Sequence, residues 1–374
     1  MRFLHTSDWQ LGMTRHFLDA DAQPRYTAAR IDAIKSIGEI AVANSCEFIL
    51  VCGDVFESNA VSPQTVGRAM EALAAVPLPV YLLPGNHDPL DAASIYTSKA
   101  FVAAKPSNVH VLDTTGVHAV SAGTEIVAAP WFSKHPLNDS VAEAISPLQA
   151  DGTLRIVAGH GAVDSLSPDA TAPSVIQLAP ITSALENGGV HYVALGDRHS
   201  KTQVGNLPVW YSGTPLAVDF REVDPGHVLL VTFDENKTAT VESKEVGTWT
   251  FRDLSLPVNT DDDVNKVRES LAWIPNKDTT IVRLAFTGTL SLKQKSDLDE
   301  VVLNSQTLFA SVQLWERNTD LAVYVYGDEL HDLGLGGFAD QAASELEKLA
   351  AVDDAQGKSA QDALSLLYRL ARSI

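Results

Sequence analysis

The chain has 374 residues, of which 45% are hydrophobic and 20% are charged, an ordinary globular composition that supports a sizeable core and roughly two or three domains. Its formal net charge of −20 argues against strong autonomous, sequence-independent binding to DNA, which depends on phosphate neutralisation by lysine and arginine. No stretch is apolar enough to span a bilayer, and the start of the chain lacks the apolar region of a signal peptide. We therefore expect a cytoplasmic protein without membrane contact.

The first part of the chain alternates strand-like and helix-like segments, a pattern typical of an α/β core. Apolar runs and helical periodicity predict strands at residues 1–6, 48–52 and 80–83 and helices at residues 26–44 and 62–76. Ser62 is the expected N-cap of its helix, with Pro63 in the first turn. The two cysteines, Cys46 and Cys52, flank or enter an apolar strand, so we expect buried thiols in a reducing cytoplasm.

The middle of the chain is richer in strands. Strands are predicted at residues 109–112, 125–129, 154–158, 192–195, 209–212 and 228–233, and helices at residues 139–145 and 180–186. Helical segments are sparser than a strictly alternating βα pattern requires. A mixed sheet, or two stacked sheets with outer helices, therefore fits better than a purely parallel sheet.

Composition changes divide the chain into three predicted domains, at residues 1–240, 241–330 and 331–374. The first boundary lies in a polar stretch, residues 234–247, that follows the last predicted core strand. The second domain reads as a small α+β unit, with helices at 264–273 and 296–309 and strands at 280–286 and 321–326. After the glycine-rich residues 334–337, two amphipathic helices are predicted at 338–352 and 360–372, joined by residues 353–357, with leucine stripes that include Leu370. They could dock on a partner or equally on their own chain.

Five predicted strand ends carry polar side chains, and four of them also carry a glycine. The motifs are Ser7-Asp8-Trp9-Gln10, Gly53-Asp54, Gly85-Asn86-His87-Asp88, Gly159-His160 and Gly196-Asp197-Arg198-His199. Each motif alone is more often a turn or a helix cap than a functional site. Because α/β sheets place ligands at the carboxyl ends of their strands, the joint pattern predicts one shared site. Asp, Asn and His from several strand ends are what a two-metal phosphoester-cleaving site needs.

These motifs resemble those of the calcineurin-like metallophosphoesterase superfamily. Within it, residues 2–12, 51–56 and 211–215 are similar to the SbcD-type nuclease subunits of bacteria. The motif resemblance covers about residues 1–230, and the later domain order is also similar. It implies an α/β protein, α+β overall, with a β-sandwich core flanked by helices, a small α+β capping domain and carboxyl-terminal helices.

The same resemblance implies a role for each site residue. Asp54 would bridge two metal ions, the first held also by Asp8, Gln10 and His199 and the second by Asn86, His160 and Asp197. His87 would face the scissile phosphate as proton donor or charge stabiliser, with Asp88 orienting it.

Two positions depart from the family pattern, since Gln10 and Asp197 each stand where a histidine is usual. An amide oxygen is a poorer donor than imidazole to a transition metal, whereas a carboxylate is a good hard ligand. The change adds one negative charge, which favours a harder ion, Mn²⁺ first and Mg²⁺ as the alternative, and weakens the first metal position. His16, in a nearby loop, could supply the missing donor, although such a histidine is more often solvated.

The expected activity is metal-dependent hydrolysis of phosphodiesters at DNA ends and hairpins, as exonuclease and endonuclease. The resemblance also implies an SMC-like ABC ATPase partner of the SbcC type, a homodimer of nuclease subunits within a heterotetramer, and a role in DNA repair, recombination and replication. Binding to DNA would depend on that partner or on local basic residues, namely Arg15, Arg25, Arg30, Arg198 and Lys201.

Two alternatives remain open. The chain could be a stand-alone metallophosphodiesterase acting on a nucleotide or another small diester, although such an enzyme needs no partner-docking helices. It could also be a non-catalytic scaffold for DNA ends with a degraded metal site. The retained residues Asp54, Asn86, His87, His160 and His199 speak against decay.

Overall fold

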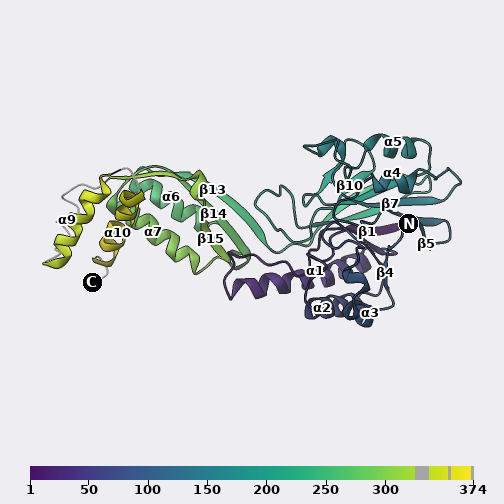
Figure 1. The fold of residues 1–374 in the computed structure, drawn as a ribbon, viewed down its shortest axis with the longest axis horizontal. Helices are drawn as coiled ribbons and strands as arrows, with labels where there is room; N and C mark the ends of the chain where they lie inside the picture. The colour runs from purple at the N-terminus through teal and green to yellow at the C-terminus, as the bar shows by residue number, and fades with distance from the viewer. Residues whose placement is uncertain (325–336, 353–354, 372–374) are drawn as a thin grey trace. The chain divides into compact units, whose positions relative to one another are not determined.

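The computed structural model describes residues 1–324, 337–352 and 355–371. They form two compact units, Met1–Trp249 and Thr250–Ile374, which are described separately (Figure 1). Most of the predicted glycine-rich linker, the end of the strand predicted at 321–326, and the residues 353–354 between the last helices lie outside the described residues. Within the described residues, no helix is long and apolar enough to cross a membrane.

The first unit is built on two six-stranded sheets. The first sheet has the order β12-β11-β1-β2-β3-β4. Its strands are β1 (Arg2–Thr6), β2 (Ile49–Cys52), β3 (Val80–Leu83), β4 (Val109–Val111), β11 (His227–Phe233) and β12 (Ala239–Glu245). Strands β1 to β4 are parallel, and β11 and β12 extend the sheet antiparallel from β1.

The second sheet has the order β5-β6-β7-β8-β10-β9. Its strands are β5 (Gly116–Ser121), β6 (Thr124–Ala128), β7 (Leu154–His160), β8 (Tyr192–Gly196), β9 (Thr202–Gln203) and β10 (Val209–Tyr211). Its four central strands are parallel, with an antiparallel strand at each edge. The expectation of two stacked sheets is therefore confirmed.

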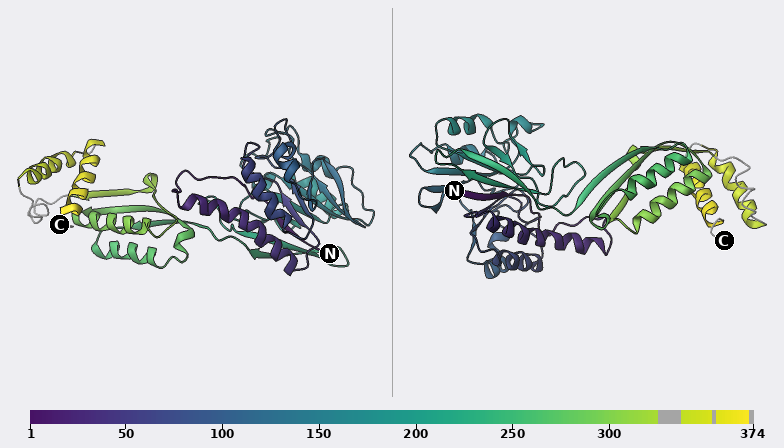
Figure 2. Two further views of the ribbon diagram at one scale, coloured as in Figure 1. Left: turned by 90° about the horizontal axis from the view of Figure 1, so that it is seen from below. Right: turned by 180° about the vertical axis from the view of Figure 1, so that it is seen from behind.

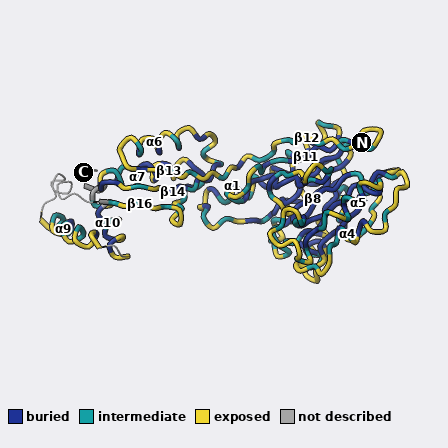
Figure 3. The backbone as a smooth tube through the Cα atoms, turned by 90° about the horizontal axis from the view of Figure 1, so that it is seen from above, coloured by how far each residue is buried: buried dark blue, intermediate teal, exposed yellow. Residues whose placement is uncertain are grey.

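Helices cover the outer faces of both sheets (Figures 1 and 2). These are α1 (Ala22–Ala43), α2 (Pro63–Ala74) and α3 (Lys99–Ala104) on the first sheet, and α4 (Ser140–Ile145) and α5 (Leu178–Glu186) on the second. Side chains of β1 alternate between two cores, because successive strand residues point to opposite faces. Leu4 packs among helix residues, whereas Phe3 lies between the sheets against Phe48 and Tyr192. Figure 3 shows that central strands of the first unit, such as β8 and β11, are largely buried.

The start of α2 confirms its predicted cap, since the Ser62 hydroxyl accepts a hydrogen bond from the Thr65 backbone N–H at 3.1 Å. Met70 and Leu73 of α2 are buried in the core of their own unit. The polar stretch 234–247, by contrast, does not simply follow the last core strand. It contains β12, an edge strand with one neighbour and half-exposed side chains, which explains why its sequence lacks an apolar run.

The second unit is a four-stranded parallel sheet with helices. It consists of β13 (Thr250–Pro257), α6 (Asp261–Ala272), β14 (Thr280–Ser291), α7 (Leu292–Gln306), β15 (Ser311–Leu314), β16 (Asp320–Tyr324), α9 (Phe338–Ala350) and α10 (Ala355–Ala371). Short 3-10 helices lie in the two units at Ile95–Thr97, Asp164–Leu166, Lys277–Thr279 and Glu316–Asn318. Helix α10 begins at Ala355, five residues before its predicted start at residue 360 and inside the predicted joint of residues 353–357.

The carboxyl-terminal helices pack on their own chain through small residues. Ala343 of α9 and Ala360 and Leu364 of α10 lie in one buried cluster with Leu292, the first residue of α7. Other apolar side chains of this pair remain outside it, since Phe338 of α9 is 87% exposed and Leu366 of α10 is 47% exposed. Self-packing therefore buries some apolar side chains of the helix pair and leaves others exposed.

Candidate metal centre

The predicted site residues lie at the carboxyl ends of strands from both sheets. Asp8 and Asp54 closely follow β1 and β2, Asn86 follows β3 after the Pro84-Gly85 turn, His160 is the last residue of β7, and Asp197 directly follows β8. Because parallel strands end at a common edge, side chains that are distant in the sequence meet there.

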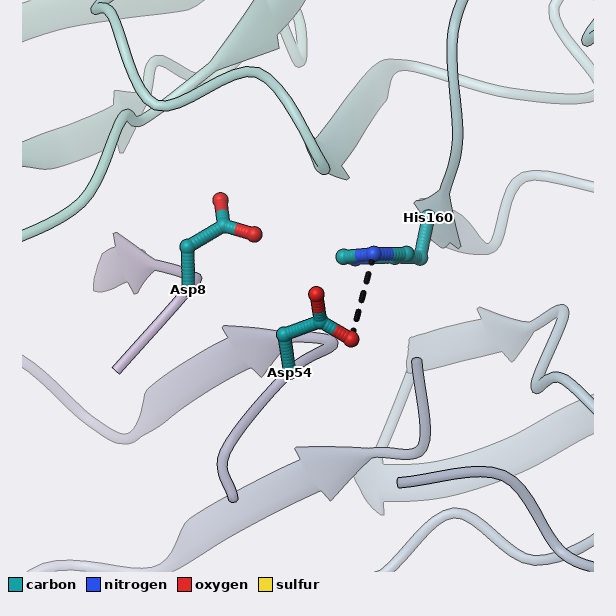
Figure 4. Close-up of side chains that lie close together, drawn as sticks. All are labelled: Asp8, Asp54 and His160. Atoms are coloured by element: carbon teal, nitrogen blue, oxygen red, sulfur yellow. Dashed lines mark ion pairs between the residues drawn. The ribbon is translucent and has the colours of Figure 1, made fainter. Parts of the chain in front are cut away.

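Asp8, Asp54 and His160 form a tight buried group (Figure 4). One ligand atom from each of the three lies within 4.8 Å of the others, a spacing that a shared cation can span. His160 Nε2 is 3.4 Å from Asp54 Oδ1 and 3.9 Å from the more exposed carboxylate of Asp197. The Asp197 backbone N–H in turn donates to Asp8 Oδ1 at 3.1 Å. Three carboxylates therefore converge beside one imidazole.

An amide and an imidazole face each other on one side of this group. His160 Nδ1 donates to the Cys52 carbonyl at 2.9 Å, because a carbonyl oxygen only accepts. This leaves Nε2 facing the Asn86 carbonyl oxygen Oδ1 at 2.7 Å. Two acceptors at that distance require a proton or a cation at Nε2. Burial opposes protonation of His160, but the neighbouring Asp54 carboxylate raises the pKa of the imidazole well above its usual value.

A second amide–imidazole pair is formed by Gln10 and His199, whose Nε2 atoms are 3.1 Å apart. His199 Nδ1 is held by Glu222 Oε1 at 2.9 Å, so Nε2 is the atom directed at the amide. Gln10 is only 2% exposed, and in the described chain its Oε1 is buried without a hydrogen-bond partner. A buried, unpartnered amide oxygen is unusual and calls for an explanation. A half-turn of the amide would present Oε1 to a cation beside His199.

The residues of this cluster suit a pair of divalent cations. The cluster offers carboxylate oxygens, amide oxygens and imidazole nitrogens, a donor set suited to Mn²⁺ or Mg²⁺. Five of the seven residues predicted as ligands are joined by the contacts described above, namely Asp8, Asp54, Asn86, His160 and Asp197. The remaining two, Gln10 and His199, form a pair next to this group, since the Gln10 backbone N–H donates to the Asp54 carbonyl at 2.9 Å. His16, considered as a substitute donor, is exposed and contacts the ring of Phe17.

The backbone at four of these residues has positive φ, at Asp8 (54°), Gln10 (45°), Asp54 (52°) and Asp197 (94°). Side chains rarely adopt such angles, and residues held there cluster at functional sites when the surrounding structure enforces them. Close backbone approach adds a second constraint. A Cβ on Gly53 would lie 2.0 Å from His160 Nδ1, so only glycine fits at that strand end.

The two central carboxylates have different electrostatic surroundings. Burial raises the pKa of Asp8 to about 6, although the Ser7 hydroxyl donates to Oδ2 at 2.6 Å. Burial also opposes ionisation of Asp54, but the imidazole of His160 and the backbone N–H of His87, 2.9 Å from Oδ1, keep the pKa of that carboxyl below its usual value. A cation next to Asp8 would therefore favour the ionised form of this carboxyl.

His87 and Asp88 have separate surroundings. His87 Nδ1 donates to the Glu57 carbonyl at 2.9 Å, which orients the ring and leaves Nε2 available. Asp88 is fully buried, and its oxygens accept from the backbone of Gly85 (2.7 Å) and Phe56 (3.0 Å) and from the Tyr96 hydroxyl (2.6 Å). Asp88 thus fixes the loop that carries His87, whereas the ring itself is oriented by Glu57.

Sequence reasoning missed several supporting residues. Glu222 orients His199, Ser7 binds Asp8, and the Thr214 hydroxyl donates to the Asp8 carbonyl at 2.9 Å. Ser7 and Thr214 lie in the segments that carried the family resemblance, which was the available signal. Nothing in the sequence around Glu222 distinguishes it from other surface carboxylates.

The chain is similar to several known proteins. Residues 1–201 match the family described as calcineurin-like phosphoesterase. The D subunit of the nuclease SbcCD from Rhodobacter capsulatus is 26% identical over 272 residues, 61% of this chain and 65% of that protein, which is just under two thirds of its length. The protein of the same name from Escherichia coli K12 is 26% identical over 290 residues, 66% of this chain and 68% of that protein.

A shorter likeness exists to "DNA double-strand break repair protein Mre11" of Archaeoglobus fulgidus. It is 33% identical over 91 residues, 24% of this chain and 19% of that protein. A solved structure from Thermus thermophilus aligns with 66% of this chain and 98% of its own, at 10% identity and a TM-score of 0.41.

Proposed function

Because the chain belongs to the calcineurin-like phosphoesterase family, we propose that it is the nuclease subunit of an SbcCD-type complex, which hydrolyses phosphodiester bonds at DNA ends and hairpins. One observation carries the proposal. The buried Asp8, Asp54 and His160 group lies at the strand ends, where the amide of Asn86 faces His160 and the amide of Gln10 faces His199. Such a donor set suits two divalent cations, and two-cation sites are suited to in-line displacement at phosphorus.

Each residue has a part in this mechanism. Asp54 would contact both cations, with Asp8, Gln10 and His199 on one of them and Asn86, His160 and Asp197 on the other. When bound, the cations lower the pKa of a coordinated water and neutralise charge on the phosphate. Glu222 and the Cys52 carbonyl hold the two imidazoles in the tautomer that leaves Nε2 free for binding.

His87 would act on the phosphate as the proton donor or charge stabiliser. The Glu57 carbonyl holds Nδ1–H, so a protonated ring would present Nε2–H to the leaving oxygen. Asp88 is a positioning residue, because it anchors the loop beneath His87 through Gly85 and Phe56. Mn²⁺ is the proposed ion, with Mg²⁺ as the alternative, since the site carries three carboxylates and one imidazole beside each amide.

The proposal extends to partners. The relatives named as subunits of SbcCD support an SMC-like ATPase partner, and the apolar side chains left exposed on α9 and α10, such as Phe338, would suit its binding. The net charge of −20 favours a subunit that relies on a partner for its grip on DNA. A homodimer of the nuclease subunit within a heterotetramer completes the proposed assembly.

The test is cleavage of blunt duplex and hairpin DNA by the full chain in Mn²⁺, with and without the ATPase partner. We expect cleavage that EDTA stops and that Asp54→Asn abolishes, whereas Asp32→Asn, a change at an exposed residue of α1, leaves it unchanged. Cleavage of a small chromogenic diester but not of DNA, even with the partner, would favour the stand-alone phosphodiesterase. Absence of bound Mn²⁺ by elemental analysis would favour the scaffold.

A further inference from the structure

Arg30 of α1 is a buried arginine that the mechanism above does not use. It is 2% exposed, and its hydrogen-bond partners are neutral. Nη1 donates to the Trp9 carbonyl at 2.8 Å, and Nη2 donates to the Tyr26 hydroxyl at 2.7 Å and contacts Met13 Sδ at 3.4 Å. Nε is buried without a partner among the described residues. The Glu57 carboxylate attracts the Arg30 charge, but Arg30 forms no ion pair among the described residues. Because burying a charge without a directly paired counter-ion is unfavourable, Arg30 requires a reason beyond packing.

The atom that Arg30 binds lies in the middle of the loop that presents the first metal ligands. Trp9 stands between Asp8 and Gln10, whose φ angles are 54° and 45°. A left-handed conformation is unfavourable for such residues and persists only where its surroundings enforce it. All three carbonyls of the loop are bound, that of Asp8 by Thr214 Oγ1 (2.9 Å), that of Trp9 by Arg30 Nη1 (2.8 Å) and that of Gln10 by Met13 N (3.1 Å).

Arg30 is itself held rigidly. Its guanidinium lies over the ring of Tyr26, with Cζ 4.8 Å from the ring centroid. The Tyr26 hydroxyl accepts from Arg30 and donates to the Ala217 carbonyl at 2.8 Å. The arginine therefore connects helix α1, the Ala217 segment and the Trp9 carbonyl in one fixed arrangement, as expected of a group that positions another.

We propose that Arg30 is a positioning residue that holds the loop of Asp8, Trp9 and Gln10 in its left-handed conformation and thereby sets the affinity of the first metal position. The inference rests on the proposed function of the metal site. Without the bond from Arg30, the Trp9 carbonyl would be buried and unpartnered, and the loop would relax. Asn86, which follows β3, and His160, at the end of β7, are assigned to the second metal ion and would keep their positions.

The experiment is a calorimetric titration of the metal-free full chain with Mn²⁺. For Arg30→Met, which keeps an unbranched apolar stem but removes the guanidinium donors, we expect one of two sites to weaken by about 10–100-fold, the range for groups that orient metal ligands. Arg30→Lys, which retains one donor group, should restore part of that loss. Tyr26→Phe should weaken the same site less, since it removes only the support of Arg30.

The matched control is Arg155→Met, because Arg155 is the other buried arginine of the first unit among the described residues, 6% exposed, at the opposite end of β7 from His160. It should lower thermal stability and leave both Mn²⁺ affinities unchanged. If folded Arg30→Met and Tyr26→Phe bind Mn²⁺ like the wild type while the wild type cleaves DNA, this inference alone fails. If the wild type binds two Mn²⁺ ions and Arg30→Met loses one, but no DNA is cleaved, the inference stands and the nuclease proposal fails.

Discussion

The side chains at the candidate metal centre depend on hydrogen bonds that fix which atom of each ring or amide faces inward. His160 and His199 each use Nδ1 to bind an acceptor, the Cys52 carbonyl in one case and Glu222 in the other, and so direct Nε2 to the centre. This arrangement fixes which ring nitrogen faces the centre, which raises the basicity of the ligand and reduces the reorganisation needed when a cation replaces the proton on Nε2. The same device at His87 uses the Glu57 carbonyl.

Replacing His87 separates chemistry from metal binding. We expect His87→Ala to bind Mn²⁺ like the wild type but to cleave DNA about 10²–10⁴-fold more slowly, the usual contribution of a general acid. Single-turnover cleavage at saturating Mn²⁺ measures this, with elemental analysis as the metal readout. His135→Ala, which removes an exposed histidine, is the control. Near-normal turnover in His87→Ala would remove that residue from the chemistry.

In the proposed site, Gln10 sets the preference of the first metal position between Mn²⁺ and Mg²⁺. Because imidazole binds transition metals better than an amide oxygen does, Gln10→His should raise the affinity of that position for Mn²⁺ roughly tenfold, with less effect on Mg²⁺. Gln10→Leu, which has no donor atom, should weaken both ions. Competitive titration of Mn²⁺ against Mg²⁺ gives the ratio. An unchanged ratio in Gln10→His would place Gln10 outside the coordination sphere.

At the level of elements, the site requires strands from two sheets to end close to one another. Glycines at those ends permit the close approach of one strand's backbone to side chains of the other sheet. Gly53→Ala places a Cβ 2.0 Å from His160 Nδ1 at a φ of 88°, so we expect loss of Mn²⁺ binding as well as stability. Gly123→Ala is a matched control, since its φ is 79° but nothing lies within 4 Å of the added carbon. Both changes carry about 1–2 kcal/mol of left-handed strain. Equal melting temperatures and Mn²⁺ affinities in the two variants would contradict the close-approach argument.

The two sheets are also joined by a buried histidine. His5 of β1 contacts the Tyr192 hydroxyl and the Leu195 carbonyl of β8, each at 3.2 Å, and burial lowers its pKa to about 3. Between pH 6.5 and 3 the unfolded chain therefore binds a proton that the folded chain excludes. Stability should fall with falling pH by about 1.4 kcal/mol per unit from this residue alone.

Comparing His5→Gln with the wild type isolates that contribution, because every other group titrates in both proteins. The free energy of unfolding in urea, measured from about pH 6.5 to 4.5 without metal, should depend less steeply on pH in the variant. His135→Gln should keep the wild-type slope, since His135 is exposed. Identical slopes in all three proteins would mean that His5 is protonated in the folded state.

For the whole molecule, sequence patterns predicted the buried strands. They missed the edge strands and the contacts between residues distant in the chain. The strand predicted at 80–83 matches β3 because a buried parallel strand reads as an apolar run. Edge strands such as β5 and β12 have half-exposed, polar-alternating sequences and gave no such signal. The residues gathered at the candidate metal centre were predictable from their strand-end motifs, whereas Glu222 and Arg30 contact residues distant in the chain and gave no such signal.

The two compact units have separate cores, one around the sheets of residues 1–249 and one around β14, and this division predicts how the chain melts. Because only the first unit contains the candidate metal centre, Mn²⁺ should stabilise that unit alone. At about 100 times its dissociation constant a ligand adds about 2.7 kcal/mol, which corresponds to a melting shift of about 5–10 °C for a unit of this size. Scanning calorimetry of the full chain should therefore resolve a Mn²⁺-sensitive and a Mn²⁺-insensitive transition. Asp54→Ala should abolish the shift, and a single transition moved as a whole would show that the units unfold together.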